Sequence, residues 1–141
     1  MNSKLNEILL VDDNEADNFL HRAVLEDADV AEKVTEVLNG EEALDYLTTP
    51  DEAGALPKPE LICLDINMPV MNGWEFLEAY EQLDEELRQG VVIMMLTTSL
   101  NPEDARTAGG RPSVKAFSNK PLTRESLQDL LEHHFPGRFD L

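Results

Sequence analysis

Four apolar residues, Leu61–Leu64, stop abruptly on Asp65 and are followed by a turn that contains Pro69 and Gly73. A short apolar run bounded by turn residues indicates a strand buried on both faces, the pattern of a parallel sheet covered by helices on both sides. Ligands of such sheets bind outside the carboxyl ends of the strands, so Asp65 would face the usual site. Taken alone, a solvated strand end or a cap for the turn explains Asp65 better.

The same pattern recurs along the chain. Strands are predicted at 7–13, 33–38, 91–97 and 114–118, in addition to 61–64. Apolar spacing and caps predict helices at 16–24, 41–47, 73–83, 101–109 and 123–135. Five strands that alternate with five helices indicate an α/β fold, a doubly wound five-stranded parallel sheet. No repeat or linker indicates a second unit, so we expect a single domain over 1–141, with its core from about 6 to 135.

The first predicted helix carries a specific expectation about burial. Its apolar residues recur at i, i+3, i+4, i+7 and i+8, which is the spacing of one helical face packed on a core. They are Ala16, Phe19, Leu20, Ala23 and Val24. The polar residues at 14–17 are interpreted as turn and cap material. The pattern therefore predicts that the apolar face lies on the sheet.

Composition excludes several classes of protein. A formal charge of −18 argues against nucleic-acid binding, because phosphate recognition needs clustered Lys and Arg. No apolar run approaches the roughly 18 residues of a membrane span, and the N-terminus lacks the pattern of a signal peptide. The single cysteine, Cys63, lies inside an apolar strand and is predicted to be a buried small hydrophobic residue. We therefore expect a cytoplasmic protein that binds neither nucleic acid nor membrane.

Polar residues follow four of the predicted strands. Asp12 and Asp13 end the first, Asp65 ends the third, Thr97 ends the fourth, and Lys120 comes just after the fifth. In a parallel sheet these strand ends point the same way, so the five residues can converge on one cleft. Three carboxylates gathered there repel one another unless one is protonated or a cation binds. An all-oxygen site of this kind favours Mg²⁺.

Thr97 and Lys120 add what a phosphoryl group needs. Thr97 offers a hydroxyl and Lys120 a positive charge, which together can hold the oxygens of a phosphoryl group beside a carboxylate. An ionised aspartate is already a nucleophile, so transfer to Asp65 needs positioning and charge neutralisation but no general base. Asp65, Thr97 and Lys120 are therefore the candidate catalytic residues.

These residues carry a resemblance to a known family. The chain resembles the response-regulator receiver domain of two-component signalling at Asp12-Asp13, at 65–73, at 96–99 and at Lys120-Pro121, in the order of the family and over nearly its whole length. The resemblance implies a flavodoxin-like (βα)5 topology with strand order 2-1-3-4-5. The long loop at 48–59 resembles single-domain receivers that partner phytochrome-type kinases, which are often dimeric, so a homodimer is an open alternative.

The resemblance implies a role for each acid. Asp65 accepts a phosphoryl group from a phosphohistidine on a sensor histidine kinase or a phosphotransfer protein. Mg²⁺ is held by Asp13, Asp65 and the backbone carbonyl of Asn67, and by Asp12 through water. The phosphoprotein then signals by contact with a protein target. Apart from catalysing its own phosphotransfer and slow dephosphorylation, such a protein is not an enzyme.

The resemblance also implies roles around the phosphate. Thr97 and Lys120 read the phosphoryl group, and an aromatic residue three positions before the lysine, here Phe117, rotates inward together with the threonine. A plain core role on its strand explains Phe117 as well. The peptide bond between Lys120 and Pro121 is cis in the family, which aims the lysine.

Two features depart from the family pattern. Gly109-Gly110 and Pro112 shorten the helix after Thr97, although receivers commonly signal through the surface formed by this helix, the last strand and the last helix. Thr98 is bulkier than the Ala or Gly often found beside the switch threonine, which bears on access of water to the phosphoryl group.

Four functions compete for this site. No output domain is expected after the last helix, so the first function is that of a diffusible receiver that docks on a target. The second is that of a phosphorelay intermediate, which passes the phosphoryl group to another histidine. A third is an aspartyl-nucleophile phosphohydrolase, which is disfavoured because Asp65-Ile-Asn lacks the second acid of that family's Asp-x-Asp. The fourth, a degenerate receiver used only for binding, is disfavoured by the intact set of acids, Thr97 and Lys120.

Overall fold

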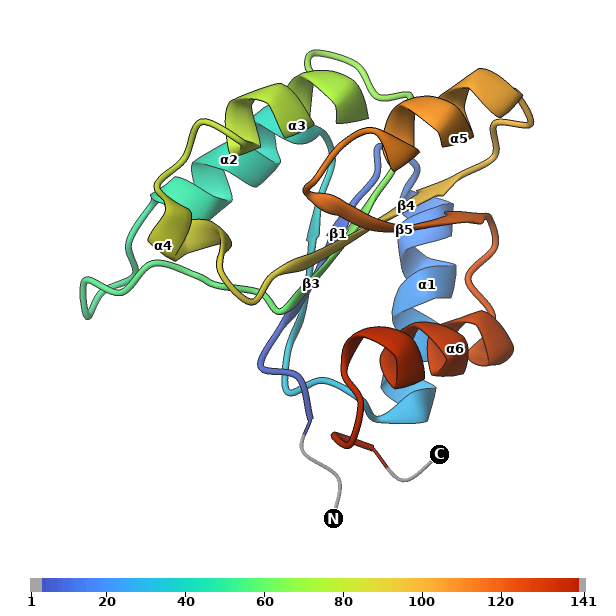
Figure 1. Cartoon of the computed structure of the whole chain (residues 1–141). Helices are drawn as coiled ribbons and strands as arrows, with labels where there is room; N and C mark the ends of the chain where they lie inside the picture. The colour runs from blue at the N-terminus through green and yellow to red at the C-terminus, as the bar shows by residue number, and fades with distance from the viewer. Residues whose placement is uncertain (1–3, 140–141) are drawn as a thin grey trace.

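One sheet of five parallel strands organises the chain (Figure 1). The computed structural model describes residues 4–139. Along the chain the strands are β1 (Ile8–Val11), β2 (Val34–Val37), β3 (Leu61–Leu64), β4 (Val92–Thr97) and β5 (Val114–Asn119). They lie side by side in the order β2-β1-β3-β4-β5. This topology confirms the predicted doubly wound α/β class and the strand order 2-1-3-4-5.

Helices cover both faces of this sheet. They are α1 (Glu15–Ala28), α2 (Gly40–Thr48), α3 (Gly73–Tyr80), α4 (Glu85–Arg88), α5 (Pro102–Gly109) and α6 (Arg124–His134). Five of them correspond to predicted helices, and α5 ends at Gly109, as the sequence indicated. The single turn α4 was not predicted, and α3 stops at Tyr80, three residues before the predicted end. None of the helices within residues 4–139 is both long enough and apolar enough to cross a membrane.

Successive strand residues point to opposite faces and so build two cores. One core packs β-strand side chains against α2, α3 and α5, and contains Leu9, Val11, Ile62, Leu64, Ile93 and Met95. The other packs them against α1 and α6, and contains Ile8, Leu10, Leu61, Cys63, Met94 and Leu96. Burial raises the pKa of the Cys63 thiol to about 12, so this residue is a buried hydrophobic side chain, as predicted.

The buried face of α1 differs from the prediction. Of the face expected on the sheet, Ala16, Phe19, Leu20 and Ala23 are exposed and Val24 is half-buried. The helix packs instead through Asn18, His21 and Leu25, which have helical spacing too. Periodicity alone could not separate the two faces. The amide nitrogen of Asn18 donates to the backbone carbonyl of Asp12 at 2.9 Å, and this hydrogen bond offsets part of the cost of burying the side chain, whose Oδ1 has no hydrogen-bond partner among the described residues.

N-terminal caps fix the starts of the helices that follow β1 and β3. Asn14 accepts a hydrogen bond from the backbone N–H of Asp17 and begins α1 directly after β1. Asn72 and Glu75 form a capping box at the start of α3, which follows the turn after β3. Both helices therefore begin at the edge of the sheet where the candidate site residues lie.

Candidate functional site

Three carboxylates meet at the carboxyl edge of the sheet. Asp12 and Asp13 follow β1, and Asp65 follows β3, which is the neighbour of β1. Each can offer one oxygen such that the three oxygens lie within 4.8 Å of one another. Asp12 and Asp65 are buried and Asp13 is exposed, so the cluster opens to solvent on one side. The predicted convergence of these acids is confirmed.

The backbone fixes the two buried acids. The N–H of Asp12 donates to the carbonyl of Val37 at 3.1 Å, and the N–H of Asp65 donates to the carbonyl of Val11 at 3.0 Å. These bonds continue the parallel ladder one residue past each strand. Asp65 also orients its own carboxylate, because Oδ1 accepts a hydrogen bond from the N–H of Ile66 at 2.9 Å. The position of the acids thus follows from strand register.

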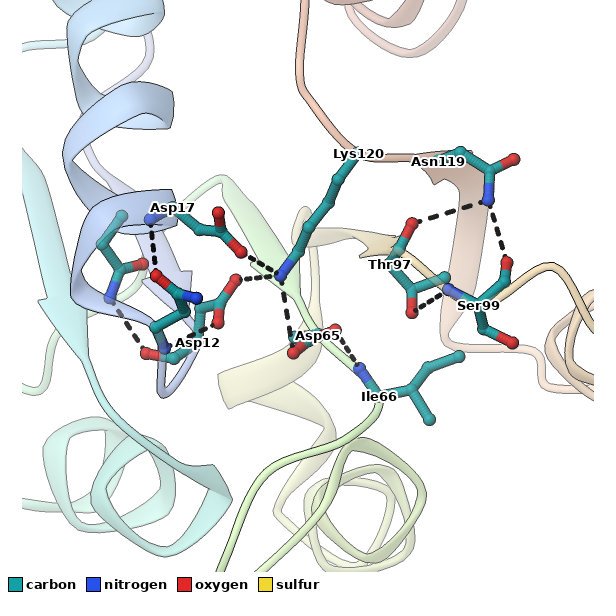
Figure 2. A network of polar contacts seen from close by, with 10 residues as sticks. Asp12, Asp17, Asp65, Ile66, Thr97, Ser99, Asn119 and Lys120 are labelled. Carbon is teal, nitrogen blue, oxygen red and sulfur yellow. Dashed lines mark hydrogen bonds and ion pairs between the residues drawn. The ribbon is translucent and has the colours of Figure 1, made fainter.

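Lys120 inserts its ammonium among carboxylates, as Figure 2 shows. The Nζ atom lies 2.5 Å from Asp12 Oδ2, 2.9 Å from Asp17 Oδ2 and 3.5 Å from Asp65 Oδ2. Its backbone N–H donates to the carbonyl of Thr97 at 2.8 Å, which places the start of this side chain beside the end of β4. The Lys120–Pro121 peptide bond is cis, as the family resemblance implied.

The pKa values of Asp65 and Lys120 reflect a balance between burial and the charges nearby. Burial raises the pKa of Asp65 and the charge of Asp12 raises it further, and these effects outweigh the opposing influence of Lys120. Burial lowers the pKa of Lys120, but hydrogen bonds to Asp12 and Asp17 and the charge of Asp65 more than offset this, so its pKa is raised and it remains an ammonium. A second cation at the acids would favour the ionised form of Asp65.

A divalent metal ion fits this set of donors. The cluster offers three carboxylates that repel one another, and among the described residues the Lys120 ammonium pairs with only two of them, Asp12 and Asp65. Carboxylate and carbonyl oxygens are the ligands that Mg²⁺ and Mn²⁺ take in proteins, and Asp13 is open to solvent, from which ions arrive.

Thr97 lies at the end of β4 and is fully buried. Its Oγ1 accepts a hydrogen bond from the N–H of Ser99 at 3.1 Å, within the loop that leads to α5. No hydrogen bond between the Thr97 hydroxyl and the three acids is present among the described residues, and Figure 2 shows the threonine on the opposite side of Asp65 from Asp12. Within residues 4–139 the hydroxyl accepts this hydrogen bond and donates none, so its O–H is available to a ligand.

Two further predicted residues, Asn67 and Phe117, make no side-chain hydrogen bond to the acids within the described part of the chain. Asn67 is exposed in the turn that follows Asp65, where its side chain makes no recorded hydrogen bond among the described residues. Phe117 is half-buried on β5 and packs against the core formed with α2, α3 and α5. This packing is compatible with the core role that the sequence left open for Phe117.

Three site residues escaped the sequence analysis, and all come from α1. Asp17 was interpreted as cap material, whereas its carboxylate contacts Lys120. Asn18 and His21 line a small buried hollow together with Asp12 and Asp65. Their helical spacing with Leu25 was a usable signal, but polar residues are rarely assigned to a buried face.

This is a doubly wound α/β domain with an acidic site capped by a lysine at the carboxyl edge of the sheet. The family model of the response regulator receiver domain matches residues 8–132. The chain belongs to this family, which functions in two-component signalling.

Curated and solved relatives agree with this assignment. The probable methanogenesis regulatory protein FilR2 of Methanothrix harundinacea is 33% identical over 125 residues, which cover 89% of this chain and 78% of that protein. The crystal structure of a two-component response regulator from Cytophaga hutchinsonii is 30% identical, with a TM-score of 0.84, and the match covers 94% of this chain and 98% of that chain.

The similar structures include a phytochrome response regulator and a metal-bound response regulator. The phosphorylated cyanobacterial phytochrome response regulator RcpA is 29% identical, with a TM-score of 0.75, over 92% of this chain and 94% of its own. The Mn²⁺-bound form of response regulator Rcp1 is 27% identical, with a TM-score of 0.73, over 96% of this chain and 98% of its own.

Proposed function

We propose that this receiver domain accepts a phosphoryl group on Asp65 from a phosphohistidine of a sensor kinase or phosphotransfer protein, and that it signals by contact with a protein target. One observation carries the proposal. The Asp65 carboxylate ends a central strand inside a cluster of three acids, and the Lys120 ammonium lies 3.5 Å from its Oδ2. This arrangement supplies a nucleophile together with positive charge for an incoming phosphoryl group.

The transfer step needs only groups of this kind. An oxygen of ionised Asp65 attacks phosphorus and forms the O–P bond of an acyl phosphate, while the P–N bond of the phosphohistidine breaks. The electron pair of that bond stays on the imidazole nitrogen. The imidazole then takes up a proton from solvent. Lys120 favours the ionised form of Asp65 and offsets the negative charge of the phosphoryl oxygens.

The acids also suit a Mg²⁺-dependent reaction. Asp13, Asp65 and the backbone carbonyl of Asn67 would hold the ion, with Asp12 acting through water. When bound, Mg²⁺ supplies the positive charge that lets carboxylates and phosphoryl oxygens approach one another. Response regulator Rcp1 has been crystallised in a Mn²⁺-bound form, and Mn²⁺ has ligand preferences similar to those of Mg²⁺, which supports a divalent metal ion here.

Thr97 and Lys120 would convert phosphorylation into a change of shape. The unused O–H of Thr97 can donate to a phosphoryl oxygen, and Phe117 would follow the threonine inward. Two hydrogen bonds to a charged phosphate, at about 1.5–3 kcal/mol each, approach the roughly 5.5 kcal/mol that reverses a 1:99 equilibrium. The two contacts are therefore large enough to operate a switch.

A phytochrome-type sensor kinase is the donor that the comparisons favour. RcpA is described as a phytochrome response regulator in its phosphorylated form, and its structure aligns with nearly the whole of this chain. The long loop of residues 49–60 between α2 and β3, on which the same sequence resemblance rested, is present in the structure.

The direct test is labelling by acetyl phosphate in the presence of Mg²⁺, measured as an 80 Da mass increase. We expect the wild-type chain to be labelled and Asp65→Asn to remain unlabelled. Asp45→Asn, which changes an exposed acid on α2, is the matched control and should label normally. Undiminished labelling of Asp65→Asn would refute the assignment. Incubation of the labelled protein with a histidine phosphotransfer protein then distinguishes a relay from a terminal receiver.

A further inference from the structure

The Lys120 ammonium has one partner that the proposed function does not use. Asp17 lies in the first turn of α1, not at a strand end, and its Oδ2 is 2.9 Å from Lys120 Nζ. This contact is shorter than the 3.5 Å from Nζ to Asp65 Oδ2. In the structure the lysine is therefore held more closely by α1 than by the proposed acceptor, as the contacts drawn in Figure 2 show.

The position of Asp17 is fixed by its surroundings. Its backbone N–H donates to the side chain of Asn14 at 3.0 Å, which forms the cap of α1. One residue later, Asn18 donates from its side chain to the carbonyl of Asp12 at 2.9 Å and ties the first turn of the helix to the end of β1. The Lys120 side chain is 8% exposed and that of Asp17 is 28% exposed, so their contact is largely shielded from solvent.

The Asp17 carboxylate has Lys120 as its one hydrogen-bonding partner among residues 4–139. Asp12, by contrast, also accepts a hydrogen bond from the N–H of Asn14 through Oδ1 and belongs to the acidic cluster. Asp17 is thus the acid whose contacts are explained by Lys120 alone.

An ammonium carries three N–H donors, and three carboxylates already surround Lys120. A phosphoryl group on Asp65 adds another acceptor to the same nitrogen. Nζ donates hydrogen bonds to Asp12 and Asp17, whereas its contact with Asp65 is an ion pair at 3.5 Å, the longest of the three. To reach hydrogen-bond distance from the phosphoryl group, the ammonium must shift toward Asp65, and this shift lengthens its contact with Asp17. Asp17 and Asp65 lie on opposite sides of Nζ in Figure 2, so the contact that directly opposes the phosphoryl group is the one to Asp17.

We propose that Asp17 is a positioning residue that holds Lys120 toward α1 and competes with the phosphoryl group on Asp65 for the ammonium. The inference rests on the proposed function. Asp17 then influences how readily the phosphorylated state forms, because the free energy gained from the contact between Lys120 and the phosphoryl group is reduced by the loss of the contact between Lys120 and Asp17. It also links α1 to the site through a single ion pair between elements far apart in the sequence.

Asp17→Asn replaces the carboxylate by an amide of nearly the same shape and weakens the competing contact with Lys120. Hydrogen bonds with a charged acceptor are about twice as strong as those with a neutral one. We expect Asp17→Asn to bind a phosphoryl analogue about tenfold more tightly, which corresponds to about 1.4 kcal/mol. Asp17→Glu retains the charge and should stay near the wild-type affinity. Asp27→Asn, which changes an exposed α1 acid that contacts Arg124, is the matched control.

The probe is beryllofluoride at saturating MgCl₂, with its dissociation constant measured by ¹⁹F NMR titration. A purely structural role for Asp17 would change the urea midpoint of unfolding but not this dissociation constant, so both are measured for every variant. Should Asp17→Asn not fold, Asp17→Ser removes the same charge and is tested in its place.

The outcomes separate the two proposals. Tighter binding by Asp17→Asn, with Asp27→Asn and Asp17→Glu near the wild type, supports the competition. Unchanged or weaker binding by Asp17→Asn overturns it, while the proposed function stands if the wild-type chain binds beryllofluoride and is labelled by acetyl phosphate. A wild-type chain that does neither refutes the proposed function itself.

Discussion

At Gly73 the chain passes closer to Asp65 than a side chain would permit. A Cβ atom built at Gly73 would lie 2.4 Å from the carbonyl oxygen of Asp65 and 3.0 Å from the Cα of Ile66. The Gly73 N–H donates to the carbonyl of Ile66 at 2.8 Å, so the start of α3 is pressed against the turn that carries the acceptor. Both neighbouring atoms belong to the backbone, which cannot rotate away.

We therefore predict that Gly73→Ala lowers the free energy of unfolding by about 1–3 kcal/mol, the usual cost of forcing extra volume into a packed site. Apart from its chain neighbours and its own helix backbone, a Cβ at Gly109, at the end of α5, would meet no atom of the described residues within 4 Å. Gly109→Ala should therefore raise the free energy of unfolding by up to about 1 kcal/mol, because alanine is the better helix former. Urea unfolding measures both. Equal changes in the two variants would show that close packing at Gly73 is not the cause.

The sequence located the strand-end residues of the site but not all of their contacts. Asp12, Asp65 and Lys120 could be placed because the ends of parallel strands share one edge of the sheet. Which hydrogen bonds a side chain makes depends on loop geometry, which the sequence pattern does not encode. The Thr97 hydroxyl accepts from the N–H of Ser99, and Asp17 contacts Lys120 across 103 positions of sequence.

Helix α1 shows why periodicity alone can choose the wrong face. Its apolar stripe and the stripe of Asn18, His21 and Leu25 both repeat with helical spacing, and a sequence rule prefers the apolar one. The sheet selects the polar stripe, since Asn18 can donate to the carbonyl of Asp12. Phe19 and Leu20 consequently lie 70% and 53% exposed. The existence of α1 was predictable, but the identity of its buried face depended on tertiary contacts.

His21 makes the packing of α1 sensitive to pH. Burial and the charge of Lys120 lower the pKa of this histidine below its ordinary 6.5, against smaller opposing influences from Asp12 and Asp17. Below about pH 6.5, His21 therefore binds a proton in the unfolded chain that it does not bind in the folded chain. Above that pH the contribution of His21 to the free energy of unfolding is fully present. It is lost as the pH falls toward the lowered pKa of the folded state.

We predict that His21→Gln flattens the pH dependence of unfolding between pH 7 and pH 5.5. One proton bound only by the unfolded chain changes the free energy of unfolding by at most about 1.4 kcal/mol per pH unit. Urea titrations at several pH values give the slopes for the wild-type chain and for His21→Gln, with the exposed His133→Gln as control. Identical slopes in the wild-type chain and His21→Gln would show that His21 does not couple α1 to pH.

At the scale of the whole molecule, negative charge works against the fold. The chain has 29 Asp and Glu residues against 11 Lys and Arg, and its formal charge is −18. Such an excess destabilises a compact state through self-repulsion. Several cations are already used in ion pairs: Arg138 bridges to Glu60 at 2.7 Å and Arg111 to Glu81 at 2.9 Å. Three of the acids are gathered in the cluster of Asp12, Asp13 and Asp65, and the other acids add to the general excess of negative charge.

These two kinds of negative charge respond differently to salt, which gives a test of the metal site. Raising NaCl from about 0.01 M to about 0.15 M shortens the screening length from roughly 30 Å to roughly 8 Å and should raise the melting temperature through diffuse repulsion. MgCl₂ at matched ionic strength should stabilise further, by about 2.7 kcal/mol at one hundred times its dissociation constant. Asp13→Asn should keep the NaCl effect and lose most of this additional Mg²⁺ effect, because it removes one oxygen donor and one charge from the cluster. Thermal unfolding monitored by circular dichroism measures both quantities, and an undiminished Mg²⁺ increment in Asp13→Asn would place the ion elsewhere.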